Sequence, residues 1–275
     1  MHAIQTPKSV QEVLKLIAKH GKRSMLVSGV DPGGDRTPAG KVVIDLTAVG
    51  PLHEIDRKRD KVTIGTGMNL GRLARDAVGE NGLLRQAASI IANPLVRNRV
   101  TLVEALGPDS PYFDITTPLV LLEAKVRLQS PTGKRSLSIH DFLESAIKGL
   151  KKGELPTAVE FAALAPGERV GFFRVGRMGG KGSVSAAAKM KLVRMVCLDP
   201  EIVVSSLTLI PLRTKLGEKE IAGKLANEES IKKASQIAAQ EILEQAETDN
   251  AYERTLIEIT VARTLRSIME GSIPV

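Results

Sequence analysis

The sequence predicts an α+β protein, and three observations support this class. Helical and strand-like segments alternate through about the first 166 residues, strands precede helices in the remainder, and 275 residues with 43% hydrophobic side chains can bury a sizeable core. We place a boundary near Pro166-Gly167, which gives domains of residues 1–166 and 167–275. The first domain is expected to contain two α/β subdomains of about residues 1–51 and 52–166.

The first subdomain is predicted to begin with a helix and to continue with two short buried strands. Ser9 is a suitable N-cap, and apolar residues recur at helical spacing from residue 10 to residue 18. The strands are expected at residues 24–27 and 42–46. Residues 28–41 between them are rich in Gly, Pro and Asp, which predicts a loop at a strand end, where ligands often bind in α/β structures.

The second subdomain is predicted as a mixture of short strands and helices. Asn69 and Ser138 are the expected N-caps of two of its helices. The expected strands cover residues 62–65, 124–129 and 136–138, and the expected helices cover residues 70–77, 83–92, 117–123 and 139–146.

The C-terminal domain is predicted as a sheet followed by helices. A strand is expected just before the boundary, over residues 158–164. The expected strands of the C-terminal domain itself cover residues 169–175, 183–196 and 202–209, and its expected helices cover residues 228–247 and 250–269. The last helix is amphipathic, and we expect the two helices to cover one face of the sheet.

The net charge of +8 does not by itself indicate a nucleic-acid-binding protein. No nucleic-acid-binding motif is present, and with no Trp and 3% aromatic residues the chain lacks stacking surfaces. Residues 169–198 contain seven Lys or Arg and no Asp or Glu. This bias is that of a solvated face, or of a surface that meets cofactor phosphates or an acidic partner subunit.

Side chains for metal or nucleophilic chemistry are few. Cys197 is the only cysteine and lies in an apolar run, which predicts an inert core thiol. The four histidines have no metal-ligand spacing. The N-terminus has no apolar signal core, and no apolar run approaches the roughly 18 residues that span a bilayer, so the cytoplasm is the expected location.

The glycine-rich stretches do not match the common phosphate-binding motifs. Gly65-Thr66-Gly67 is not a dinucleotide fingerprint, because Leu70 occupies the place of the third glycine. The stretch at residues 179–183 contains Gly-Gly-Lys-Gly-Ser, in which glycine follows the lysine, so it is not a Walker A loop. A hairpin turn is the simpler prediction for it.

One segment carries a family resemblance. Residues 93–102 read Asn-Pro-Leu-Val-Arg-Asn-Arg-Val-Thr-Leu, and five of them (Pro94, Val96, Arg97, Asn98 and Thr101) match the pattern Pro-x-Ile/Val-Arg-Asn-x-Ala-Thr-Ile-Gly-Gly-Asn. This pattern is typical of the FAD-binding medium subunit of molybdenum hydroxylases of the carbon monoxide dehydrogenase and xanthine dehydrogenase type. Ser110-Pro111-Tyr112-Phe113-Asp114 also resembles the family's Ser-Pro-x-x-Asp, at the family's spacing from Thr101.

The resemblance implies a PCMH-type FAD-binding fold, followed by a C-terminal sheet covered by helices. It also implies that FAD lies against two loops and three further side chains. The implied residues are Ser28, Gly29, Val30 and Asp31 in the first loop, Thr101, Leu102 and Val103 in the second, Asp114 at the adenosine end, Leu155 beside the flavin, and Arg174 near its ring system. The alternatives are turn caps for Asp31 and Asp114, a core position for Leu155 and a surface position for Arg174.

Both loops depart from the family's glycine pattern. The first reads Val-Ser-Gly-Val-Asp where relatives have Ala-Gly-Gly-Thr-Asp, and Val103-Glu104-Ala105 replaces Gly-Gly-Asn in the second. The Glu104 carboxylate would repel a diphosphate unless it points away or binds a cation. Two readings therefore stay open: FAD in a shifted position, or a subunit that has lost FAD.

The function implied by the resemblance is electron transfer in a multi-subunit oxidoreductase. A molybdopterin-binding large subunit and an iron-sulfur small subunit are the implied partners, and FAD passes their electrons to an acceptor. The alternative is a degenerate flavin subunit that serves as a structural scaffold in the complex. In neither case is a catalytic side chain assigned.

Overall fold

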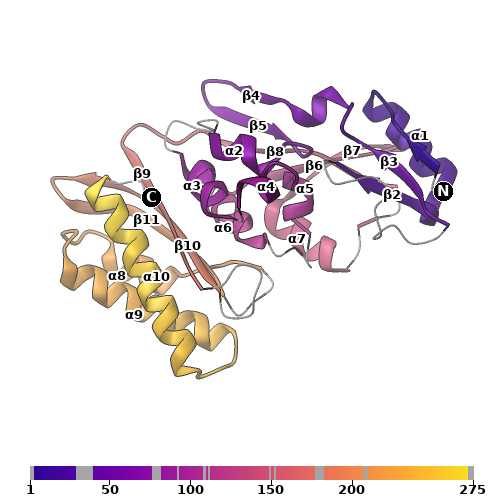
Figure 1. The fold of residues 1–275 in the computed structure, drawn as a ribbon. Helices are drawn as coiled ribbons and strands as arrows, with labels where there is room; N and C mark the ends of the chain where they lie inside the picture. Colours follow the sequence, from indigo (N-terminus) through magenta and orange to yellow (C-terminus); the bar gives the residue numbers. More distant parts are fainter. Residues whose placement is uncertain are drawn as a thin grey trace.

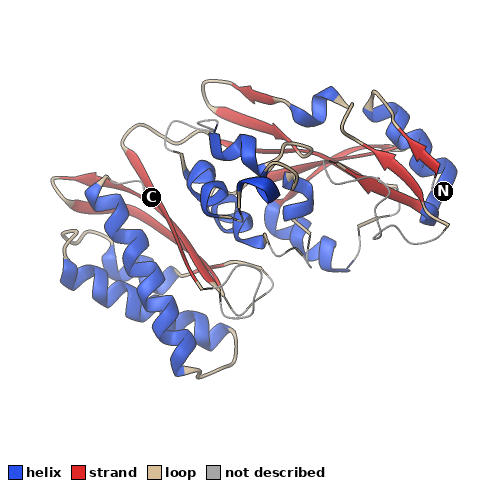
Figure 2. Ribbon diagram, in the orientation of Figure 1, coloured by secondary structure: helices blue, strands red, loops and turns tan. Residues whose placement is uncertain are grey.

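The computed structural model contains three β-sheets arranged in a row (Figures 1 and 2). It describes residues 3–28, 40–75, 82–91, 93–107, 110, 112–148, 150–151, 153–176, 183–206, 208 and 210–271. The first sheet is parallel, whereas the other two are antiparallel.

The first sheet is small and has the order β1-β3-β2. It consists of β1 (Ala3–Gln5), β2 (Ser24–Val27) and β3 (Val42–Asp45), with α1 (Val10–His20) packed beside it and η1 (Gly21–Arg23) after it. Ser9 caps α1 as predicted, because its Oγ accepts from the Glu12 N–H at 3.3 Å. Val13, Leu14 and Ile17 form the buried face of α1.

The second sheet has five strands in the order β4-β5-β8-β6-β7. Its strands are β4 (Ile55–Arg57), β5 (Lys61–Gly65), β6 (Lys125–Ser130), β7 (Gly133–Ser138) and β8 (Leu155–Ala162). The helices of this unit are η2 (Gly50–His53), α2 (Leu70–Arg75), α3 (Leu83–Ile90), α4 (Pro94–Arg97), α5 (Leu102–Ala105), η3 (Phe113–Ile115), α6 (Thr116–Leu121) and α7 (Ile139–Lys148). Asn69 and Ser138 cap α2 and α7 as predicted.

The third sheet has the order β12-β11-β10-β9. It is formed by β9 (Glu168–Val175), β10 (Val184–Val193), β11 (Val196–Ser205) and β12 (Leu212–Arg213), and it is followed by α8 (Lys215–Ile221), α9 (Glu228–Gln245) and α10 (Ala251–Glu270). The single strand predicted over residues 183–196 is wrong at its end. Arg194 and Met195 have φ of 50° and 64° and turn the chain into a hairpin between β10 and β11.

The third sheet is covered on both faces, not on one face as the sequence predicted. Side chains alternate along β10, so Ala186 and Ala188 pack towards α9 and α10, whereas Ala187 joins the core of the middle unit. Figure 1 shows α10 on one side of this sheet and α3 and α6 on the other. A buried hydrogen bond of 2.9 Å between the Thr117 and Ser185 hydroxyls joins α6 to β10.

Among the described residues, no helix is both long and apolar enough to cross a membrane.

Candidate functional site

The second predicted loop, which begins at Thr101, is the start of the short helix α5. Its chain runs beside the segment that follows β5, with an isolated bridge between Asn69 and Thr101. The Leu102 N–H donates to the Met68 carbonyl at 2.8 Å, and the Val103 N–H donates to the Thr66 carbonyl at 2.9 Å. The loop is therefore fixed by backbone contacts to residues 66–69.

The segment at residues 65–69 is itself held tightly against β8 and η2. The Thr66 hydroxyl donates to the Pro156 carbonyl at 2.7 Å, and the Thr66 N–H donates to the Thr157 carbonyl at 3.2 Å. Gly65 allows this approach, because an added Cβ would lie 2.3 Å from the Leu52 carbonyl oxygen. The glycines of this stretch thus serve close packing.

The Glu104 carboxylate reaches back to the beginning of α5. Its Oε2 accepts hydrogen bonds from the Thr101 N–H and the Thr101 hydroxyl, both at 2.8 Å, as in a capping box. The backbone N–H of Ser28, which follows β2, also interacts with this carboxylate and lowers its pKa. Burial raises the pKa of Glu104, and these hydrogen bonds oppose that effect.

The first predicted loop is only partly described. Ser28 is 2% exposed, and its hydroxyl oxygen has no hydrogen-bond partner among the described residues. Gly29, Val30 and Asp31 lie outside the described residues. Ser28 and Thr101 are nevertheless brought together, because the N–H groups of both interact with the Glu104 carboxylate.

Asp114 and Arg174 are brought into direct contact. The Arg174 Nε lies 2.5 Å from the Asp114 Oδ2, and the two side chains are 8% and 10% exposed. Arg174 also donates to the Gly176 carbonyl at 3.1 Å. The surface alternative for Arg174 is therefore wrong, because its guanidinium is buried in an ion pair between β9 and η3.

Leu155 lies at the start of β8 and is 2% exposed. It packs in the same apolar cluster as Ile17 of α1, Ile44 of β3 and Leu52 of η2. The structure thus gives this side chain a core position between the first and second sheets.

The second loop does not offer free donors to a diphosphate in this conformation. The N–H groups of Thr101, Leu102 and Val103 are all bonded to protein oxygens, namely those of Glu104, Met68 and Thr66. The half-buried Glu104 side chain adds a carboxylate at the same place. Residues 101–105 therefore do not fit the diphosphate contact that the family pattern implies.

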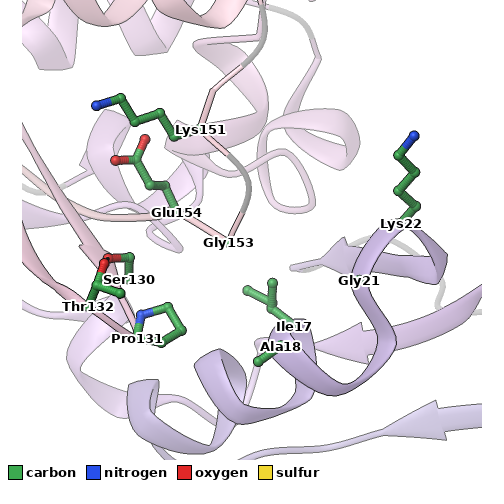
Figure 3. A pocket seen from close by; sticks show the side chains of 10 residues that line it. All are labelled: Ile17, Ala18, Gly21, Lys22, Ser130, Pro131, Thr132, Lys151, Gly153 and Glu154. Carbon is green, nitrogen blue, oxygen red and sulfur yellow. The ribbon is translucent and has the colours of Figure 1, made fainter.

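A cavity of about 420 Å³ lies elsewhere, between the end of α1 and the β6–β7 turn (Figure 3). Ile17 and Ala18 line one side, and Pro131 and Thr132 line another. It contains none of the predicted cofactor residues. Glu154, which precedes Leu155, lines it and forms a two-pronged ion pair with Arg135 at 2.6 and 2.9 Å.

Metal or thiol chemistry has no support in the described part of the chain. No group of three or more His, Cys, Asp or Glu that could hold a metal occurs there. Cys197 is buried, and this burial raises the pKa of its thiol, which favours the inert thiol.

The capping role of Glu104 was not predicted from the sequence. Nor was the role of the Thr66 and Met68 carbonyls, which accept hydrogen bonds from the second loop. The pattern Thr101-x-x-Glu104 was a readable signal, since Thr followed three residues later by Glu is a capping box. No local pattern indicated the residues 66–68, because their contact with the loop spans more than 30 positions.

The fold and the loop segments place the chain in the class of α+β proteins with a PCMH-type FAD-binding fold. A family model described as the FAD binding domain in molybdopterin dehydrogenase matches residues 1–162. The chain belongs to this family.

Relatives extend the similarity to the whole chain. The carbon monoxide dehydrogenase medium chain of Hydrogenophaga pseudoflava is 25% identical over 95% of this chain and 94% of its own length. The glyceraldehyde dehydrogenase medium chain of Sulfolobus acidocaldarius is 25% identical, with 84% and 85% covered. The xanthine dehydrogenase FAD-binding subunit of Escherichia coli O157:H7 is 27% identical, with 59% and 58% covered.

Solved structures share the fold. A chain of quinoline 2-oxidoreductase from Pseudomonas putida 86 superposes with a TM-score of 0.84 at 21% identity, covering 100% of this chain and 99% of that one. A chain of the reconstituted CO dehydrogenase from Oligotropha carboxidovorans superposes with a TM-score of 0.82 at 20% identity, covering 99% of each.

Proposed function

We propose that this chain is the medium subunit of a multi-subunit molybdenum hydroxylase. The observation that carries the proposal is the match to a carbon monoxide dehydrogenase medium chain over 95% of this chain and 94% of that relative. Its partners would be a molybdopterin-binding large subunit and an iron-sulfur small subunit. The relatives named as medium chains support this arrangement.

In this role the chain would place FAD so that electrons from the iron-sulfur clusters reach an acceptor. FAD supplies the redox chemistry, and the protein contributes position and electrostatics. The buried Ser28 hydroxyl, which has no partner among the described residues, is a donor that remains available at the first loop. The family model over residues 1–162 supports this assignment.

A second candidate is a scaffold subunit that docks the partners without carrying FAD. One specific observation favours it: the N–H groups of Thr101, Leu102 and Val103 are all used within the protein. We therefore keep both candidates, which differ in one measurable property, the presence of flavin.

We also propose the division into a FAD-binding-type domain of residues 1–166 and a C-terminal domain of residues 167–275. Pro166 and Gly167 lie in the turn between β8 and β9, where the chain leaves the second sheet and enters the third. The end of the family match at residue 162 agrees with this boundary.

The test is to purify the tagged chain from its own cells, to measure the visible spectrum and to assay molybdenum and iron. A flavin spectrum with both metals supports the electron-transfer subunit. A preparation with both metals and no flavin after incubation with excess FAD identifies the scaffold. A chain that purifies without molybdenum and iron contradicts both candidates.

A further inference from the structure

The Glu104 side chain connects the two predicted loops. It accepts two hydrogen bonds from Thr101, and it interacts with the Ser28 N–H, so it connects the residue after β2 to the beginning of α5. These segments are more than 70 residues apart in the sequence. A carboxylate that holds two such segments through N–H donors makes the same kind of contacts as a bound anion.

The position of this carboxylate in the motif is unusual. Glu104 stands at the second of the two positions where the family pattern has Gly-Gly. A glycine there leaves the donors to an external ligand, whereas Glu104 uses the Thr101 N–H and hydroxyl itself. The remaining loop N–H groups are directed to Thr66 and Met68. The Glu104 carboxylate and the carbonyls of Thr66 and Met68 therefore accept the hydrogen bonds that this loop can donate.

We propose that the Glu104 carboxylate is a built-in anion that holds Ser28 and Thr101 together and keeps a diphosphate from binding between them until the carboxylate is displaced. The natural source of this diphosphate would be FAD, and this identification alone rests on the proposed function. The internal link between the two segments does not depend on it.

The chain offers a matched control for the experiment. Glu12 occupies the third position of α1, as Glu104 does in α5, and accepts a hydrogen bond from the Lys8 N–H at 2.8 Å. Its side chain is exposed, and its hydrogen-bond partners Lys8 and Ser9 lie within four residues. Glu12→Gly therefore carries the same loss of a carboxylate and the same added backbone freedom as Glu104→Gly.

The first measurement is FAD affinity, by fluorescence titration of the full chain. We expect the Kd of Glu104→Gly to be lower than that of the unmodified chain by about tenfold or more, because a like charge beside the diphosphate is removed. Glu104→Gln should show part of this gain, and Glu12→Gly should show none. A Kd within about twofold across all four proteins would overturn the proposal.

The second measurement needs no flavin. Without added anion, Glu104→Gly should melt about 2–4 °C lower than Glu12→Gly, since the link between two segments is lost. Inorganic diphosphate should raise the midpoint of Glu104→Gly and leave that of the unmodified chain unchanged. Equal midpoints for the two glycine variants, or no response to diphosphate, would overturn the proposal even if no protein binds FAD.

The two proposals fail in different ways. If the chain purifies without molybdenum and iron but Glu104→Gly shows the melting behaviour described above, the proposed function fails and the internal link stands. If the chain purifies with both metals and Glu104→Gly behaves like Glu12→Gly, the internal link fails and the proposed function stands.

Discussion

Glu104 gives the molecule a titrating group whose charge matters to stability. Its burial favours the neutral acid, so its pKa in the folded chain lies above its ordinary value of 4.5. A raised carboxyl pKa means that the folded state holds this proton at pH values where the unfolded chain has released it. The stability that this bound proton contributes to the folded state is fully present below about pH 4.5. It is lost as the pH rises through the raised pKa of Glu104.

Glu104→Gln is expected to remove this pH dependence. The free energy of unfolding of the unmodified chain, minus that of Glu104→Gln, should fall as the pH rises from 4.5, because only the carboxyl group can lose a proton. Urea unfolding at several pH values measures the difference, in which the other titrating groups cancel. A difference that is constant with pH would contradict the prediction.

The Asp114–Arg174 pair is expected to behave as a buried ion pair. Arg174→Leu should lower the free energy of unfolding by about 3–5 kcal/mol, because it leaves the Asp114 carboxylate buried and unpaired. The double variant Asp114→Asn with Arg174→Leu should lose less than the sum of the single variants. Denaturant unfolding of the four proteins tests this, and strictly additive losses would show that the pair is not coupled.

At the scale of elements, close contacts between helices and strands depend on small residues. Gly171 of β9 lies under α10, where an added Cβ would come within 2.6 Å of the Thr264 carbonyl oxygen and 2.5 Å of the Ser267 hydroxyl oxygen. Thr264 also donates to Thr260 within α10, so this part of the helix is already ordered. The third sheet and α10 can approach each other only because β9 has no side chain there.

Gly171→Ala is expected to destabilise the protein by about 1–3 kcal/mol, because the added methyl group forces β9 and α10 apart. Gly50→Ala is the control, since its nearest neighbour would be a flexible Glu54 oxygen at 3.9 Å, and its effect should stay within about 0.5 kcal/mol. Thermal melting of both variants compares them. Equal midpoints would show that β9 and α10 have room to adjust.

At the scale of the whole molecule, the third sheet ties the C-terminal part to the middle unit. Phe172, Ala187 and Val203 project from it into the core formed by α3, α6 and the second sheet. The opposite face carries a separate apolar cluster with α9 and α10. One sheet therefore contributes to two cores, and the middle unit lacks part of its own core without residues 167–275.

The fragment of residues 1–166 is accordingly expected to lose cooperative folding, although the family match ends at residue 162. It would expose the apolar surfaces of α3 and α6 that the third sheet covers. Circular dichroism melting of the fragment against the full chain measures this. A fragment that melts as sharply and as high as the full chain would show that the proposed N-terminal domain is independent.

The sequence by itself determined the class of fold, most helices and strands, and the family. Local signals were enough for these features: Ser9, Asn69 and Ser138 start helices through contacts within four residues. The match at Pro94, Val96, Arg97, Asn98 and Thr101 indicated the family, which the family model shows.

Only the tertiary structure decided which contacts the residues of the candidate site make. It also decided that helices pack on both faces of the third sheet. Arg174 meets Asp114 across 60 positions, and Glu104 meets Ser28 across 76, so no local pattern specifies either contact. The second face of the third sheet was missed for the same reason, because Ala186 and Ala187 are alike in sequence and differ only in which helices they face. Contacts between distant segments depend on how the sheets pack, and that packing is set by the whole chain.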